Sequence, residues 1–81
     1  MDNAATSKTI IDVRQMLPRT RHPLIFDTFA GLKAEETLLV ITNHEPWPLQ
    51  YQFNVRHRDQ FGWCYEEEGP DVWRVRINRK A

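Results

Sequence analysis

The chain is poor in the residues that form disulfides and metal sites. It has one cysteine and three histidines among 81 residues. A single cysteine excludes an intramolecular disulfide, and the sequence contains neither a His-x-x-x-His motif nor a cysteine pair. It also shows no secretory leader and no apolar run long enough to cross a bilayer. We therefore expect a soluble, cytoplasmic protein without a membrane partner.

Net charge is missing as well. Eleven basic and eleven acidic side chains cancel, and the isoelectric point is about 6.8. A general binder of nucleic acid would be visibly basic, so we do not expect DNA as a partner. The length allows one domain with one core. We assign that domain to residues 8–81, and the small, polar, aperiodic stretch 1–7 is predicted to be a disordered tail.

Hydrophobic periodicity predicts six elements in the order β-α-β-α-β-β. The first two strands should be parallel and joined through the first helix, and the last two should form a hairpin. The predicted fold class is α+β: a two-layer α/β sandwich whose four-stranded mixed sheet carries two helices on one face. The expected strands are 8–13, 37–42, 61–65 and 72–77, and the expected helices run from His22-Pro23 to about Gly31 and from Pro48 to about Arg58.

Polar side chains should gather at one edge of this sheet. Both helices begin where a parallel strand ends, so their first turns and free amide groups should lie along the same edge. The segment 43–49 (Asn-His-Glu-Pro-Trp-Pro-Leu) brings an imidazole, a carboxylate and an indole to that edge. The candidate ligand-binding residues are Arg14, Arg21, His22, His44, Glu45 and Trp47.

Each candidate also has a structural interpretation. Arg14, Arg19 and Arg21 could clamp a phosphate or carboxylate together with the helix start, or they could be solvated, with Arg14 paired to Asp12. His22 could bind an anion or a metal, or only begin a helix beside Pro23. His44 could be a metal ligand, an acid–base group or a hydrogen bond that shapes its loop.

No metal, cofactor or catalytic residue is predicted. A zinc or iron site built from His22, His44 and Glu45 would still need a further ligand, so the two histidines stay no more than candidates. Cys64 lies in a strand between aromatic residues, which is typical of a packing position. Trp63 and Trp73 are in phase with core positions, Trp47 should be partly exposed, and His57 should be solvated or favourable to a helix dipole.

Several segments resemble a known group of proteins. Residues 11–14 (Ile-Asp-Val-Arg) and 22–26 (His-Pro-Leu-Ile-Phe) are similar to the opening of the TusA-like (SirA-like) small proteins. Residues 43–49, 51–53, Trp63 and 68–75 more specifically resemble a sister family, the DUF2249 domain family of unknown function. The resemblance covers 11–79. It implies the same β-α-β-α-β-β fold, a bacterial or archaeal cytoplasmic setting and occurrence beside hemerythrin-like domains, but no established reaction.

The chain departs from the sulfur-carrier branch of that fold at one decisive point. The resemblance implies a Cys-Pro pair where the first loop meets the first helix, and a helix start there would stabilise the thiolate. Here residues 19–23 read Arg-Thr-Arg-His-Pro and contain no sulfur. Persulfide transfer by that route is therefore excluded, and we do not expect an enzyme.

Three functions remain open. The first is a binding module, monomeric or weakly dimeric, that recognises a small anion or a partner domain at the helix-start edge. The second is a redox or sulfur-relay relative, or a metal-binding protein, that uses Cys64 or a metal and acts with a hemerythrin-like or redox partner. The third is RNA binding on the open sheet face through Arg74 and Arg76, which the neutral charge disfavours. Glu66 and Glu68 could face these arginines across the hairpin, as pairs that tune the sheet surface and say little about activity.

Overall fold

The structure is a computed structural model that describes residues 8–80. The tail predicted at 1–7 lies outside these described residues. The elements follow the predicted order β-α-β-α-β-β. They are β1 (Lys8–Asp12), α1 (Pro18–Ala30), β2 (Thr37–Thr42), α2 (Trp47–Arg56), β3 (Phe61–Glu68) and β4 (Trp73–Arg79).

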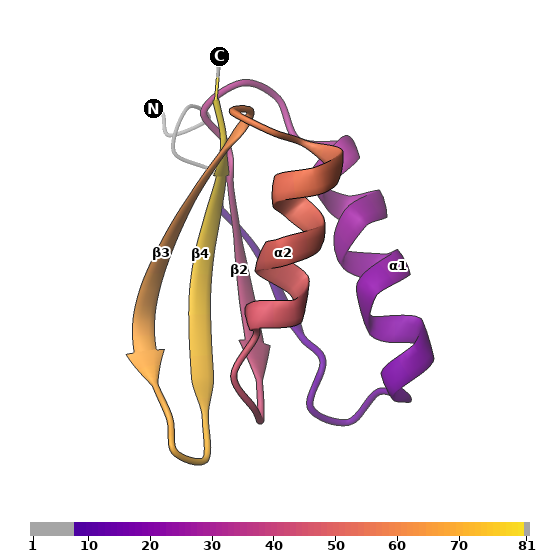
Figure 1. The fold of residues 1–81 in the computed structure, drawn as a ribbon, viewed down its shortest axis with the longest axis vertical. Coiled ribbons are helices and arrows are strands. Elements are labelled where there is room, and N and C mark those ends of the chain that lie inside the picture. The colour runs from indigo at the N-terminus through magenta and orange to yellow at the C-terminus, as the bar shows by residue number, and fades with distance from the viewer. Residues whose placement is uncertain (1–7, 81) are drawn as a thin grey trace.

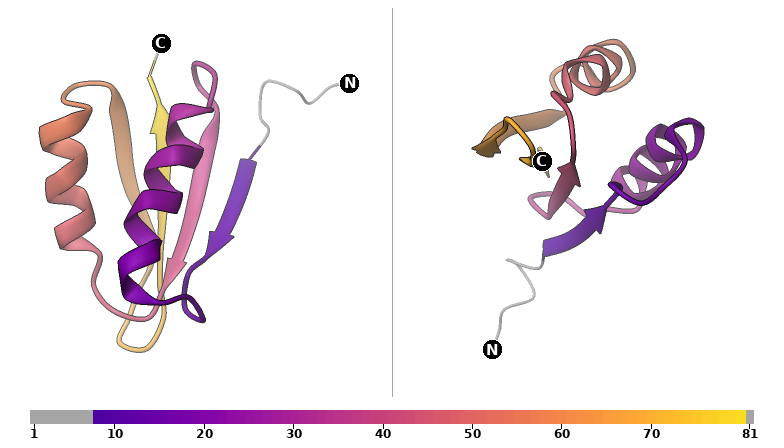
Figure 2. Two further views of the ribbon diagram at one scale, coloured as in Figure 1. Left: turned by 90° about the vertical axis from the view of Figure 1, so that its right-hand side faces the viewer. Right: turned by 90° about the horizontal axis from the view of Figure 1, so that it is seen from below.

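The four strands form one mixed sheet in the order β1-β2-β4-β3. β1 and β2 are parallel, whereas β4 is antiparallel to both β2 and β3. Both helices cover the same face of the sheet, and their first turns lie at the end where β2 terminates (Figure 1; Figure 2). The α+β fold predicted from the sequence is confirmed.

β2 is one of the two inner strands of the sheet, and it is apolar on both faces. Leu38 and Val40 point into the helix-covered core, and Leu39 and Ile41 are buried on the opposite face. Two arginines of β4, Arg76 and Arg74, are in register with Leu39 and Ile41 of β2. The aliphatic stems of these arginines can shield Leu39 and Ile41 from water. This arrangement explains why the strand was recognised from its apolar run alone.

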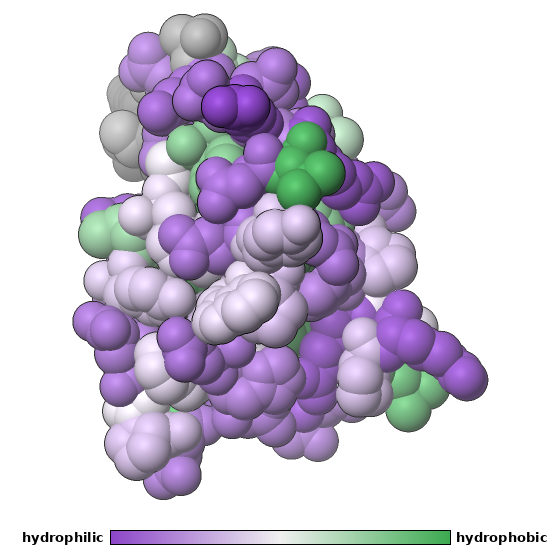
Figure 3. Space-filling view, in the orientation of Figure 1, coloured by the Kyte–Doolittle hydropathy of each residue, from purple (hydrophilic) through white to green (hydrophobic). Residues whose placement is uncertain are grey.

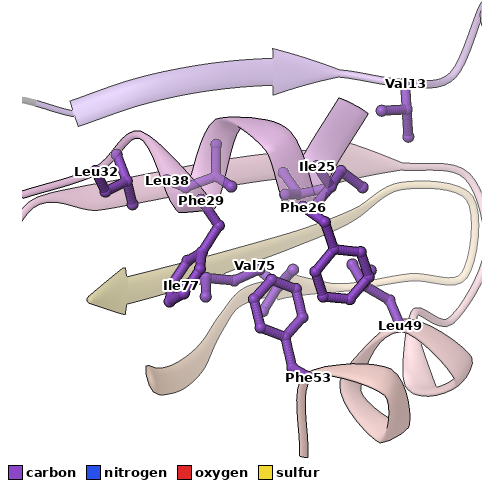
Figure 4. Packing of buried hydrophobic residues seen from close by; sticks show 11 residues of the cluster. Val13, Ile25, Phe26, Phe29, Leu32, Leu38, Leu49, Phe53, Val75 and Ile77 are labelled. Carbon is purple, nitrogen blue, oxygen red and sulfur yellow. The ribbon is translucent and has the colours of Figure 1, made fainter. Parts of the chain in front are cut away.

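The core is built around phenylalanines from both helices. Phe29 of α1 and Phe53 of α2 are fully buried, and their ring centroids lie 5.0 Å apart in an edge-to-face arrangement. Phe26 stacks on Phe53 at 4.5 Å. Figure 4 shows these rings between the helices and β4, the strand that carries Val75 and Ile77. Each fully buried side chain of this kind contributes about 1.5–3 kcal/mol to folding, so the ring cluster fixes how the two helices sit on the sheet.

The predicted start of the first helix was wrong. α1 begins at Pro18, with Leu17 in an extended conformation as its N-cap. Pro23 lies inside the helix, where the carbonyl of Arg19 loses the amide donor that a non-proline residue would supply. Pro18 and Pro23 both suit a helix start, and the earlier one is used. As a result, His22 lies in the second turn of α1 and not at its first residue.

The hairpin is longer than predicted. β3 continues through Glu68, three residues beyond the expected end at Tyr65, with a bulge between Tyr65 and Glu67. Glutamates are tolerated there because their partners on β4 are arginines. The pairs, each at 2.8 Å, are Glu66–Arg76 and Glu67–Arg74, so the predicted pairing of Glu68 is not the one formed.

Two other interpretations need correction. Cys64 is exposed and not a packing residue, because Trp63 and Tyr65 point to the core side and strand alternation turns Cys64 to the open face. His57 caps the end of α2 and is half-buried, with its ring centroid 4.8 Å from that of Phe29. Trp63 packs against the core as expected, whereas Trp73 is half-buried beside Tyr65 and outside the core cluster.

Candidate functional site

A pocket opens at the edge of the sheet where β2 ends. Its enclosed volume is about 50 Å³, and the space including the open mouth is about 350 Å³. It lies between the first two turns of α1, the end of β2 and the first turn of α2. The residues that line it are Val13, Arg21, His22, Ile25, Val40, Thr42, His44, Pro46, Pro48 and Leu49.

Arg21 is held at the pocket by contacts on two sides of its guanidinium group. Its Nε–H donates to the backbone carbonyl of Met16 at 3.1 Å, and Nη1 donates to Asn43 Oδ1 at 3.3 Å. Three ion pairs form among residues 8–80, and Arg21 belongs to none of them. Its positive charge is therefore fixed in place without a neutralising carboxylate from the described part of the chain.

His44 lies beside Arg21 at the pocket. Arg21 Nη1 lies 3.4 Å from His44 Nε2, and His44 Nδ1 lies 3.5 Å from the carbonyl oxygen of Glu45. Because the guanidinium can only donate, Nε2 accepts, and the ring proton of the neutral imidazole is assigned to Nδ1. Both contacts are long, so an incoming anion can replace His44 as the partner of Arg21 at little cost.

His22 is the third polar side chain at the pocket. Partial burial lowers the pKa of its imidazole from the usual 6.5; a hydrogen bond with Gln52 opposes this shift, and the nearby His44 and Arg21 reinforce it. His22 is therefore neutral at pH 7. A neutral imidazole has one N–H group, and because the contact with Gln52 raises the pKa, that N–H donates to Gln52. His22 therefore shapes the pocket without adding charge.

The inner part of the pocket is apolar. Val13, Ile25, Val40 and Leu49 are all buried core residues that also line the pocket. Thr42 is buried beside them and adds a hydroxyl group. Apolar walls below a polar mouth are the usual composition of a small-molecule site.

The start of α2 forms one wall, but it supplies fewer donors than expected. Pro46 and Pro48 both line the pocket, and a proline has no amide hydrogen. α1 contributes its second turn, through Arg21 and His22, and not its free first-turn amides. The predicted contribution of two helix starts is thus replaced by side chains.

The structure brings together three of the six candidate residues. Arg21, His22 and His44 line the pocket, whereas Arg14, Glu45 and Trp47 do not.

Arg14 is bound to Asp12 through Nε at 2.9 Å and Nη2 at 2.7 Å, which is the local pair considered from the sequence. These hydrogen bonds lower the pKa of Asp12 from 3.8 to about 2. Asp12 also precedes the inward-pointing Val13, so strand alternation puts its side chain on the open face. Arg14 is held over that face, away from the pocket.

Trp47 is the first residue of α2 and is 58% exposed, as the sequence predicted. Its ring centroid lies 6.3 Å from that of Tyr51.

Sequence reasoning missed the parts of the site that position and enclose the charge. Asn43 and the carbonyl of Met16 orient Arg21, and Gln52 contacts His22. Asn43 stood next to His44 in the segment already singled out, so its position was a usable signal. The apolar walls of the pocket gave no such signal, because their residues have the same sequence pattern as ordinary core residues.

The described residues offer neither a cluster of metal ligands nor a membrane-spanning helix. Within residues 8–80, no group of three or more His, Cys, Asp or Glu side chains could hold a metal ion. The two pocket histidines are accompanied by the positive charge of Arg21, which favours an anion over a cation. No helix in the described part of the chain has the length and apolar character needed to cross a bilayer.

The fold and site define a small α+β domain with a cationic pocket at the edge of its sheet. The chain belongs to the family described as "Uncharacterized conserved protein (DUF2249)", whose model matches residues 10–79. No curated protein and no solved structure matches the chain significantly. The family description names no activity, so the function has to be argued from the site.

Proposed function

We propose that the protein is a small cytoplasmic binding module that captures an anionic group in the pocket formed by Arg21, His22 and His44. The observation that carries the proposal is the fixed guanidinium of Arg21. It is oriented by Met16 and Asn43 and belongs to no ion pair within residues 8–80.

Arg21 has donors to spare. Its Nε–H and Nη1 groups serve the protein, whereas Nη2 has no acceptor among the described residues. A carboxylate or phosphate oxygen can bind Nη2 and take over the Nη1 hydrogen now directed at His44. Such charge-assisted hydrogen bonds are shorter and stronger than neutral ones.

The site needs little rearrangement to bind. Arg21 lies on a regular helix turn, and its hydrogen bond to Met16 restricts the torsions of a side chain that would otherwise lose entropy on binding. The planar guanidinium is also preorganised for a bidentate anion. These features favour binding over catalysis, since no nucleophile lines the pocket apart from the hydroxyl of Thr42 and the imidazoles.

Arg21→Ala tests the proposal, with Arg19→Ala as a matched control. Arg19 is an exposed arginine two residues earlier on the same helix and does not line the pocket. Acetate and phosphate binding would be followed by amide chemical shifts, with circular dichroism as the check on folding. We expect Arg21→Ala to weaken anion binding at least about tenfold, as for a lost hydrogen bond to a charged group, and Arg19→Ala to change it less than twofold. Equal losses in the two variants would point to general electrostatics and contradict the proposal.

Partner docking is a second candidate function, favoured by an apolar stripe on α2. Trp47, Tyr51 and Val55 are 58%, 62% and 65% exposed and recur every four residues, so they share one side of the helix. Figure 3 shows pale and green surface over α2 at this position. We propose a hemerythrin-like domain as the partner, which is what the family resemblance implies.

This second function has its own test. Tyr51→Lys places a charge in the middle of the stripe without touching the pocket. We expect it to abolish binding of a hemerythrin-like domain from the same genome, measured by calorimetry, while leaving anion binding unchanged. Unaltered binding of that domain would remove the stripe from consideration.

The other two functions receive no specific support. On the open face, Arg74 and Arg76 are each bound to a glutamate at 2.8 Å, so RNA phosphates would have to displace these carboxylates. Cys64 lies on the same face, with its sulfur 3.6 Å from Arg76 Nη2, and not at a helix start where a sulfur carrier holds its thiol.

A further inference from the structure

The pocket contains more apolar surface than an inorganic anion can use. Below Arg21, the side chains of Val13, Ile25 and Leu49 are buried in the core and still reach the pocket wall. A phosphate or sulfate bound at the mouth would leave these groups without a partner. Filling the same space with an alkyl group removes apolar surface from water and adds about 0.8 kcal/mol, or about fourfold in affinity, per methylene.

The charge at the mouth also limits the ligand. Arg21 is the fixed cation of the pocket, and His22 is neutral at pH 7 because burial lowers the pKa of its imidazole. Among the described residues that line the pocket, the remaining titratable group is His44. A single guanidinium neutralises a single negative charge, so a monoanion fits better than a phosphate dianion.

The size of the pocket sets an upper bound on the ligand. The enclosed space is about 50 Å³ and opens to solvent at the mouth. A group the size of a water molecule needs roughly 10–15 Å³ of such space, so on the order of four such groups fit inside, with the polar end in the open mouth.

We propose that the pocket binds a short-chain aliphatic monocarboxylate, with its carboxylate on Arg21 and its alkyl group against Val13, Ile25 and Leu49. This inference rests on the proposed function and narrows it from anions in general to one chemical class. Isovalerate is a suitable probe because its branched four-carbon chain matches the cross-section of the valine, isoleucine and leucine side chains around it.

A ligand series separates the two parts of the interaction. Acetate, propionate, butyrate and isovalerate would be titrated into the labelled protein at pH 7, followed by amide and methyl chemical shifts. We expect the affinity to rise about fourfold per added carbon along this series. Two probes test the carboxylate: 3-methylbutan-1-ol, which keeps the alkyl group without the charge, should bind at least tenfold more weakly than isovalerate, and so should phosphate.

Val13→Thr tests the apolar wall with almost no change in volume. The added hydroxyl would meet the alkyl chain, so we expect isovalerate affinity to fall about five- to tenfold while acetate affinity stays within twofold. If this variant does not fold, the ligand series on the unaltered protein still decides the question.

The outcomes distinguish the two levels of the proposal. Acids that all bind with the affinity of acetate would overturn the aliphatic ligand and leave the anion site intact. An absence of binding by every anion, phosphate included, would overturn both. N-acetyl-leucine binding tenfold more tightly than isovalerate would replace the free acid with the carboxyl terminus of a peptide and so overturn the inference.

Discussion

The guanidinium Nη1 of Arg21 lies 3.4 Å from the imidazole Nε2 of His44, although the two residues are 23 positions apart in the chain. The parallel pairing of β1 and β2 creates this proximity, because the chain leaves both strands at the same edge of the sheet. Arg21 comes from the helix after β1, and His44 from the turn after β2. The candidate site is therefore a consequence of topology as much as of local sequence.

Arg14 is expected to be irrelevant to ligand binding despite its place beside the first loop. Its side chain is engaged by Asp12, and this pair holds the pKa of Asp12 at about 2. Arg14→Ala should leave isovalerate affinity within twofold and raise the pKa of Asp12 toward 3.8. Carboxyl carbon shifts measured between pH 5 and 1.5 would report the second change. An affinity loss as large as that of Arg21→Ala would show that Arg14 belongs to the site.

The stability of the fold should depend on His22 in mildly acidic solution. Because burial lowers the pKa of His22, the unfolded chain binds more protons than the folded chain between the folded pKa and 6.5. The contribution of His22 to the free energy of unfolding should therefore be constant above pH 6.5 and should fall as the pH drops below 6.5. Urea denaturation at pH 7.5 and pH 5.0 measures the difference.

His22→Gln supplies the control for this pH dependence. Glutamine does not titrate and can keep a polar contact with Gln52. The pH 7.5-to-5.0 difference should shrink in the variant, whereas titration of Asp12 falls at lower pH and does not interfere. An unchanged pH dependence would mean that another group is responsible.

The hairpin turn should require glycine at position 69. Gly69 has a φ of +55°, and a Cβ there would lie 2.7 Å from atoms of the Trp73 ring. Gly69→Ala should therefore destabilise the protein by about 1–3 kcal/mol. Gly31→Ala is the matched control: its φ is −84° and the nearest atom to an added Cβ is at 3.6 Å. We expect it to be neutral or slightly stabilising, and equal losses in both variants would refute the explanation by strain.

Cys64 should behave as a surface thiol. It lies on the open face of β3, exposed to solvent, so alkylating reagents should modify it nearly as fast in the folded protein as in urea. Cys64→Ser should change the free energy of unfolding by less than about 0.5 kcal/mol, as surface substitutions usually do. Strong protection of the thiol in the folded protein would restore the packing interpretation made from the sequence.

The fold could be predicted because its strongest patterns are unambiguous. The apolar run of β2 and the hairpin alternation around Val75 and Ile77 each allow one interpretation. The start of α1 was misplaced because Pro18 and Pro23 give the same local signal. The extra first turn is held by Thr20, whose amide and hydroxyl both donate to the carbonyl of Leu17.

The candidate site was predicted in part for a related reason. The shared edge follows from the order of the elements, so Arg21 and His44 could be placed together. Arg14 was included because the sequence allows it two roles, binding a ligand or pairing with Asp12. Composition cannot rank these two roles, and the structure shows the pair. The apolar wall depends on contacts between residues such as Val13 and Leu49, which are distant in sequence and carry no distinctive motif.

The most direct measurement is the ¹H–¹⁵N spectrum of the arginine Nε–H groups and histidine rings during titration with isovalerate at pH 7. We predict that the signals of Arg21 and His44 shift together with one dissociation constant, while the Nε–H of Arg14, held by Asp12, does not move. No shift at Arg21, or an equal shift at Arg14, would contradict a carboxylate site at this pocket.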